Sequence, residues 1–199
     1  MGSGPLAAMT PVVRLAAIAS GWTLMAISFA TVFEIVARKL FAYSLGSIDE
    51  IGGYVLAATS AIGFSWAFVT RSHMRITLAF PYLPATVRSV LNVLATLALA
   101  AMAIFCAWRG WTELAANIES GKPANTPLQT RLWIPQLFWF AGLAMFAITA
   151  GAAAAHAIGL FFSDRGALDR LYGSTSLEDE VRTEVSQLET RLVETEARP

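Results

Sequence analysis

The stretch DEIGGYVLAATSAIGFSWAFVTRSHMR, residues 49–75, decides the fold of this chain. Two acids open it, two arginines and a histidine close it, and the twenty residues between Glu50 and Arg71 carry no charge. Twenty helical residues rise about 30 Å, which matches the hydrocarbon thickness of a bilayer. Because a segment inside lipid must satisfy its own backbone hydrogen bonds, the stretch predicts a membrane-spanning α-helix rather than a strand.

Small residues recur at every fourth position of this predicted helix. They are Gly53, Ala57, Ala61 and Ser65. This spacing places them in one stripe, where a second helix can approach closely. We therefore predict that the stripe is a contact face and count its four residues among the candidate partner contacts. The alternative is that an alanine-rich membrane helix contains such a stripe by chance.

The overall composition is that of a membrane protein. The chain is 56% hydrophobic and 14% charged, whereas a soluble domain is about a quarter charged. A formal net charge of zero gives no indication of nucleic-acid binding. The single cysteine, Cys106, excludes an internal disulfide, and one Cys with two His cannot supply the usual ligands of a structural zinc.

Three further uncharged runs complete an integral membrane protein of the all-α class. The predicted spans are about 13–36, 50–70, 85–109 and 132–162, within a transmembrane domain at 12–163 that follows an N-terminal segment at 1–11. Residues 1–4 (MGSG) resemble an expression-vector remnant. Because Arg14 precedes the first run, a cleaved signal peptide is the alternative there. The run is longer than a typical signal core, so we favour a retained helix.

The tail, residues 164–199, is acidic and differs in composition from the rest of the chain. Val181, Val185, Leu188 and Leu192 follow a spacing of four, three and four residues. This spacing is typical of a short amphipathic helix that can pair in a coiled coil. Fewer than three heptads form a marginal helix, so we expect a short cytoplasmic tail that is helical or disordered.

Several polar residues lie near the ends of the predicted helices. Glu34 and Arg38 are four residues apart on one helix face and are interpreted as a solvated ion pair. Ser47 is predicted to cap the second helix, whose first turn then contains Asp49 and Glu50.

The third helix is predicted to continue above the membrane. Trp111, Leu114 and Ile118 fall on one face of residues 111–120. After a turn, Pro135 suits the first turn of the fourth helix. The end of the third helix, the turn and the start of the fourth helix thus form the second polar link on this side of the predicted membrane.

The middles of the four spans offer almost nothing to a polar solute. A transporter or channel needs polar groups near the membrane midplane. The exceptions here are hydroxyls, which usually bond back to their own helix backbone. They are Thr23, Ser28, Thr59, Ser60, Thr96 and Thr149. We therefore predict an accessory subunit that packs on a larger protein, with no catalysis, metal or cofactor of its own.

His73 and His156 carry a competing hypothesis. Two histidines on facing helices could ligate haem b, as in the membrane anchors of some redox complexes. His73 lies beside Arg71 and Arg75, where a solvated interfacial residue is the simpler interpretation. A tetraspan structural module without a transport partner is a third hypothesis.

Three patterns follow one another along the chain and carry a family resemblance. They are Arg38 with Asp49-Glu50, then RSHMRI at residues 71–76 with Arg88 beyond, then Gly121, Thr126-Pro127 and Leu132-Trp133-Ile134-Pro135. In this order, the chain resembles the small membrane subunit of TRAP transporters, the tripartite ATP-independent periplasmic systems for organic acids. The resemblance covers about residues 15–162.

The resemblance implies a role without translocation. In this family the large membrane subunit carries the substrate and sodium sites, and a periplasmic binding protein delivers the substrate. The small subunit would brace the large one and help to dock the binding protein during ion-gradient-driven uptake by symport. It would span the bacterial inner membrane with both termini in the cytoplasm, an orientation that the Arg71–Arg75 cluster also favours.

The same resemblance suggests which residues act. Besides the small stripe, the candidate partner contacts are Arg38, Asp49, Glu50, Glu113, Glu119, Thr126, Pro127 and Arg131. The motif residues expected at the boundary of membrane and water are Arg71, His73, Arg75, Arg88, Trp133 and Pro135.

Overall fold

The computed structural model of the chain describes residues 5–41, 46–70, 83–172, 185, 186 and 188. Its long elements are all α-helices. The helices are α1 (Pro5–Phe41), α2 (Ile48–Val69), α3 (Ala85–Ser120), α4 (Trp133–Ser163) and the short α5 (Arg165–Tyr172). The first four are long and apolar enough to cross a membrane. The predicted fold, an all-α membrane protein with four spans, is confirmed.

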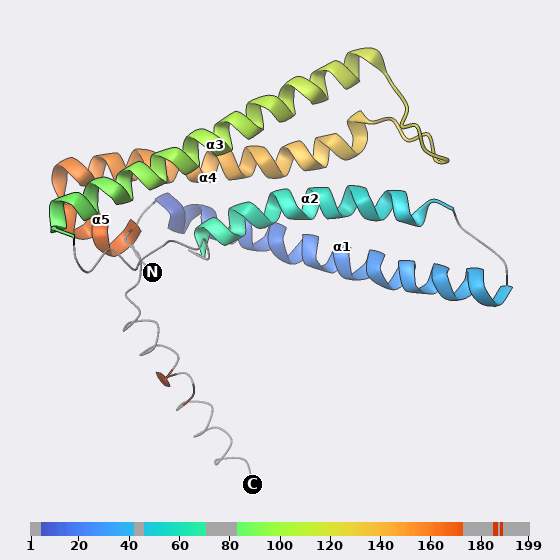
Figure 1. The fold of residues 1–199 in the computed structure, drawn as a ribbon, viewed down its shortest axis with the longest axis horizontal. Helices are drawn as coiled ribbons and strands as arrows, with labels where there is room; N and C mark the ends of the chain where they lie inside the picture. The colour runs from blue at the N-terminus through green and yellow to red at the C-terminus, as the bar shows by residue number, and fades with distance from the viewer. Residues whose placement is uncertain (1–4, 42–45, 71–82, 173–184, 187, 189–199) are drawn as a thin grey trace, which may run out of the picture.

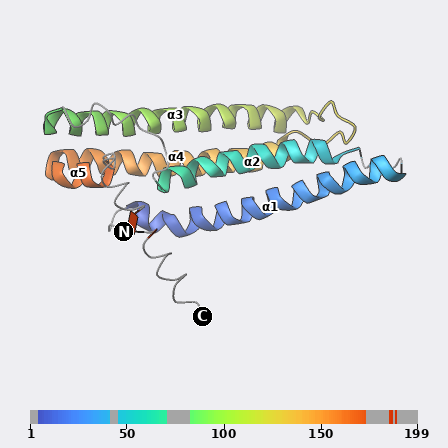
Figure 2. The same ribbon diagram turned by 60° about the horizontal axis from the view of Figure 1, so that its bottom comes forward.

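The four long helices form a row in the order α1, α2, α4, α3 (Figure 1), and in Figure 2 helices α3 and α1 lie on either side of α2 and α4. Consecutive helices run in opposite directions, so the start of α1 and the end of α4 share one end of the molecule. Leu6 packs there against the core cluster that includes Leu168 and Tyr172 of α5. The segment that joins α3 to α4 lies at the opposite end, beside the start of α2. Helices α2 and α4 are therefore inner members of the row, and α1 and α3 are outer ones.

The helices differ in length. The 22 residues of α2 rise about 33 Å, whereas the 37 of α1 and the 36 of α3 rise about 55 Å. As expected, α3 continues through residues 111–120, although only Leu114 of its predicted apolar face is buried. Helix α1 begins at Pro5, earlier than the expected span. Proline suits the first position of a helix, because the N–H that it lacks would have no helical partner there.

The predicted stripe of small residues on α2 is divided in two. Ala61 and Ser65 are buried, whereas Gly53 and Ala57 are exposed. A Cβ added at Gly142 of α4 would lie 2.7 Å from the Cβ of Ala61, so the two backbones approach as closely as small residues allow. The Ala61 half of the stripe thus forms the α2–α4 contact, and the Gly53 half faces outward.

Aromatic and small side chains fill the rest of this core. The Phe146 ring of α4 packs against Phe64 and Phe68 of α2, with centroids 5.8 and 6.4 Å apart. The small residues buried on α4 are Gly142, Ala150, Ala153, Ala154 and Ala157.

Most hydroxyls of the spans bond to their own backbone, as predicted. The side chains of Thr23, Ser28, Ser60, Thr96 and Thr149 donate to main-chain oxygens three or four residues earlier, over 2.7 to 3.0 Å. Ser65 differs, because it is fully buried and its Oγ has no hydrogen-bond partner in the described part of the chain.

Two predicted features fall outside the described residues. They are the RSHMRI pattern at residues 71–76, with His73, and most of the tail helix. Of the tail positions, Val185 and Leu188 are described, and both are exposed.

Candidate functional site

A polar arrangement lies where the start of α2 meets the segment between α3 and α4. We call this segment, residues 121–132, the connecting hairpin. Glu50 stands in the first turn of α2, and the Tyr54 hydroxyl one turn later donates to its Oε1 over 2.7 Å. Both residues are only partly exposed, so the carboxylate lies at the edge of the packed protein.

The connecting hairpin has a defined conformation of its own. Gly121 ends α3 with φ 58, a left-handed conformation that suits glycine. Pro123 and Arg131 then form a short antiparallel bridge. The closing hydrogen bonds run from Ala124 N–H to Thr130 O (2.8 Å), from Leu132 N–H to Lys122 O (3.2 Å) and from Gln129 N–H to Thr126 O (3.0 Å). The last of these closes a turn with Pro127 at its second position, where proline is favoured.

The hairpin places two hydroxyls against the Glu50 carboxylate. The Thr126 and Thr130 hydroxyls and the backbone N–H of Leu128 lie near this group on the hairpin side. Oε2 of Glu50 and both threonine Oγ1 atoms are shielded from solvent, and none makes a hydrogen bond of good geometry within the described residues. Hydroxyl hydrogens rotate freely. Small adjustments therefore allow both threonines to donate to the carboxylate.

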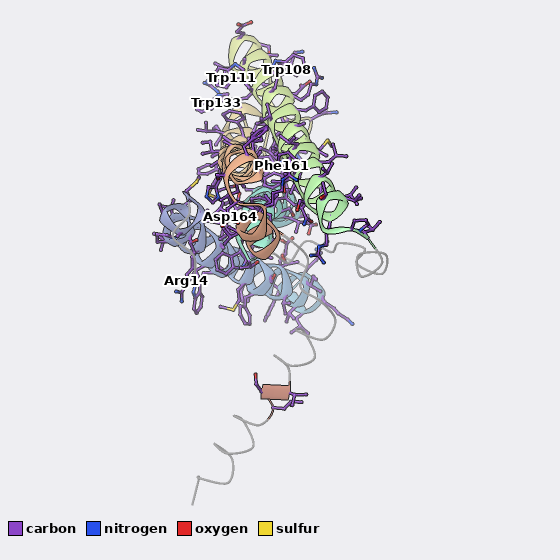
Figure 3. The ribbon with its side chains drawn as sticks, turned by 90° about the vertical axis from the view of Figure 1, so that its left-hand side faces the viewer. Arg14, Trp108, Trp111, Trp133, Phe161 and Asp164 are labelled. Carbon is purple, nitrogen blue, oxygen red and sulfur yellow. The ribbon has the colours of Figure 1, made fainter. Side chains whose placement is uncertain are left out.

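A second side-chain contact ties the end of α3 to the start of α4. The Asn117 Nδ2 donates to Gln136 Oε1 over 2.9 Å. On the same pair of helices, the centroids of the Trp111 and Phe140 rings lie 5.5 Å apart. Trp108, Trp111 and Trp133 gather on the α3–α4 side of the row, whereas Arg14 lies on α1 at the other edge (Figure 3).

The predicted partner contacts around this site are mostly exposed. The exposed ones are Arg38, Asp49, Glu113, Glu119, Pro127 and Arg131, whereas Thr126 is half-buried. Glu113 pairs with Arg109 at 3.6 Å on the surface. The structure thus brings Glu50 together with Thr126 and leaves the exposed charges of α3 and the hairpin available on the outside of this end.

The residues expected at the boundary of membrane and water are described only in part. Arg88, Trp133 and Pro135 lie in the described ranges, and each of them is partly buried. Trp133 and Pro135 stand in the first turn of α4, and Arg88 stands in the first turn of α3. All three therefore lie at helix ends, and their position at the boundary of membrane and water stays a prediction.

Two local expectations need correction. Glu34 and Arg38 do pair, at 3.7 Å, but the Glu34 side chain is only 4% exposed, so the pair is not fully solvated. Packing against the rest of the protein buries the carboxylate, which a single helix face in the sequence cannot reveal. Ser47 precedes α2 as expected, yet its side chain makes no capping hydrogen bond.

The opposite end of the row holds the second histidine. The His156 Nδ1 lies 2.9 Å from the Tyr172 hydroxyl, which joins α4 to α5. The described residues contain no group of three or more His, Cys, Asp or Glu side chains able to hold a metal. The haem hypothesis for His73 and His156 gains no support from this arrangement.

Sequence reasoning missed three residues of this architecture. Tyr54 lies four residues after Glu50, so their contact could have been inferred from the helix period. Thr130 and Gly142 carry no local signal, because each depends on a contact between segments far apart in the chain.

The fold and the site define a multi-pass helical membrane protein whose spans are apolar and whose polar contacts gather at the ends. Over residues 12–160, the chain matches the family described as "Tripartite ATP-independent periplasmic transporters, DctQ component". The chain belongs to this family, as its resemblance indicated. No curated protein matches the chain. Membership makes it a component of a transporter and implies that it associates with other components of that system.

Proposed function

We propose that this chain is the small, non-translocating membrane subunit of its transporter. It braces the large membrane subunit and helps to dock the periplasmic binding protein, for ion-gradient-driven uptake of an organic acid. The family match over residues 12–160 carries this proposal. The hydroxyls of the spans also favour it, because most of them are engaged by their own backbone and offer a solute no binding groups.

The proposal assigns the chemistry of transport to the partner chains. The substrate site and a coupling sodium site belong to the large subunit, and this chain performs no catalysis. It lies in the bacterial inner membrane with both termini in the cytoplasm. The connecting hairpin and the start of α2 then face the periplasm, where the binding protein arrives.

The exposed half of the stripe of small residues suits assembly. Gly53 has no atom within 4 Å of a Cβ built on it, and Ala57, one turn later, is exposed as well. Small residues allow a helix of another protein to approach closely in lipid. This half is the proposed contact with the large subunit, and the polar end is the proposed contact with the binding protein.

The experiment combines co-purification with transport. The chain should co-purify in mild detergent with the large subunit, and transport should be lost without it. Arg131→Glu should lower uptake at limiting binding protein while leaving co-purification intact, because exposed charges mainly affect docking. Arg165→Glu at the opposite end is the matched control. The proposal is wrong if transport survives without this chain, and its docking part is wrong if Arg131→Glu and Arg165→Glu behave alike.

A further inference from the structure

Two sequence patterns that are far apart in the chain meet at one carboxylate. Glu50 belongs to the acidic pair that opens α2, and Thr126 and Thr130 belong to the connecting hairpin between α3 and α4. Asp49, the other acid of the pair, is exposed. The two neighbouring acids therefore have different surroundings, although the sequence presents them as equivalent.

We propose that Glu50 is a positioning residue, whose carboxylate holds the connecting hairpin in one conformation against α2. The outward side of the hairpin is thereby presented as a preformed docking element. The holding role concerns this chain alone, whereas the docking role rests on the proposed function.

The surroundings of Glu50 suit an anionic anchor. A carboxylate in the first turn of a helix is stabilised by the positive end of the helix dipole. The Tyr54 hydroxyl fixes Oε1 over 2.7 Å, which leaves Oε2 to face the hairpin. Hydrogen bonds to an ionised acceptor are about twice as strong as neutral ones. Oε2 and the two threonine Oγ1 atoms are shielded from solvent, so rotation of the hydroxyls would let Thr126 and Thr130 donate to the carboxylate.

The hairpin itself has an inward and an outward side. Its inward side consists of Thr126, Thr130 and the buried Ala124. Its outward side is exposed over residues 127–129. The backbone hydrogen bonds of the hairpin close its base and its turn, but none of them joins the hairpin to α2. The two threonines are the hairpin side chains that face Glu50 of α2. Loss of the anchor should therefore release the hairpin from α2 without unfolding the helices.

Trypsin offers a direct measure of this release. Lys122 precedes a proline, which resists cleavage, so the bond after Arg131 is the informative one in the hairpin. Arg131 is bridged to Pro123, and the next residue donates its N–H to the Lys122 oxygen. Cleavage there requires the hairpin to open. When opening is fast relative to cleavage, the cleavage rate tracks the population of the open form.

The experiment compares Glu50→Gln with Asp49→Asn in the full-length chain in detergent. Each variant removes one negative charge from the first turn of α2, but only the first removes the anchor. Cleavage after Arg131, followed by mass spectrometry, should be about tenfold faster in Glu50→Gln because a charge-assisted contact is lost. It should be unchanged in Asp49→Asn. Thr130→Val, which removes a hydroxyl from the hairpin side, should accelerate cleavage as well.

The outcomes separate the anchor from the docking role. Equal cleavage rates in Glu50→Gln and the unaltered chain, or an equal acceleration in Asp49→Asn, would overturn the anchor. If Glu50→Gln loses the helical circular dichroism spectrum, that variant has unfolded, and the cleavage rate of Thr130→Val then decides the test. In the assembled transporter, Glu50→Gln should raise the concentration of binding protein needed for half-maximal uptake and leave the maximal rate intact. If cleavage is faster but the concentration of binding protein at half-maximal uptake is unchanged, Glu50 holds the hairpin, but the hairpin does not dock the binding protein.

Discussion

Helices α4 and α1 are both long and apolar, yet they occupy opposite situations. In the most apolar window of α4, 39% of the residues are buried inside the protein, whereas none is buried in that of α1. Helix α4 buries glycine and alanine, and α1 exposes large side chains such as Trp22 and Phe29. In lipid, an apolar side chain gains little by leaving the surface, so small size rather than hydrophobicity marks the inner helix.

The largest expected effect comes from one aromatic residue on each of these helices. Phe146 of α4 is 7% exposed and Phe29 of α1 is 69% exposed. Phe146→Ala should lower the free energy of unfolding by about 2–3 kcal/mol, because it leaves a cavity beside Phe64 and Phe68. Phe29→Ala should change it by less than about 0.5 kcal/mol. Thermal unfolding in detergent measures both, and equal losses would mean that α1 packs as deeply as α4.

A smaller effect is expected from the two halves of the α2 stripe. Ala61→Leu should destabilise the isolated chain by about 1–3 kcal/mol, because the added carbons have no room against Gly142. Ala57→Leu, one turn away, should leave the stability of the isolated chain unchanged. The same two variants, tested for co-purification with the large subunit, distinguish the inner half of the stripe from the proposed partner contact. An Ala57→Leu variant that unfolds as early as Ala61→Leu would contradict this division.

The smallest effect is expected at the glycines of α4. A Cβ at Gly142 would meet Ala61 at 2.7 Å, whereas a Cβ at Gly151 meets nothing within 4 Å. Alanine favours a helix over glycine by about 1 kcal/mol, so Gly151→Ala should raise the unfolding temperature slightly. Gly142→Ala should lower it, because the clash exceeds that gain. The sign difference between the two variants is the result to check, and a stabilising Gly142→Ala would show that the α2–α4 contact is looser than described.

Much of the fold was predictable because charge is a local signal. Uncharged runs bounded by residues such as Glu50 and Arg71 indicated the helices, and the continuation of α3 to Ser120 followed from its helical pattern. The hydroxyl bonds of Ser28 and Thr96 were predictable for the same reason, since each lies within one helix turn.

Contacts between helices were much less predictable. A membrane helix is apolar on its lipid side as well as on its packed side, so hydropathy does not tell which face of α4 lies inward. Gly142 and the burial of Glu34 therefore gave no sequence signal. The stripe from Gly53 to Ser65 indicated a contact face. It could not show that the neighbouring helix packs on only one half of the stripe. The contact of Glu50 with the hairpin threonines depends on how α2 and α4 are placed in the row.

The row of α1, α2, α4 and α3 is open, because its outer helices α1 and α3 lie on opposite sides of α2 and α4 (Figure 2). An open row of helices has two broad sides and is not closed into a ring. Such a shape can separate two environments within the plane of the bilayer, with lipid on one side and a neighbouring protein on the other.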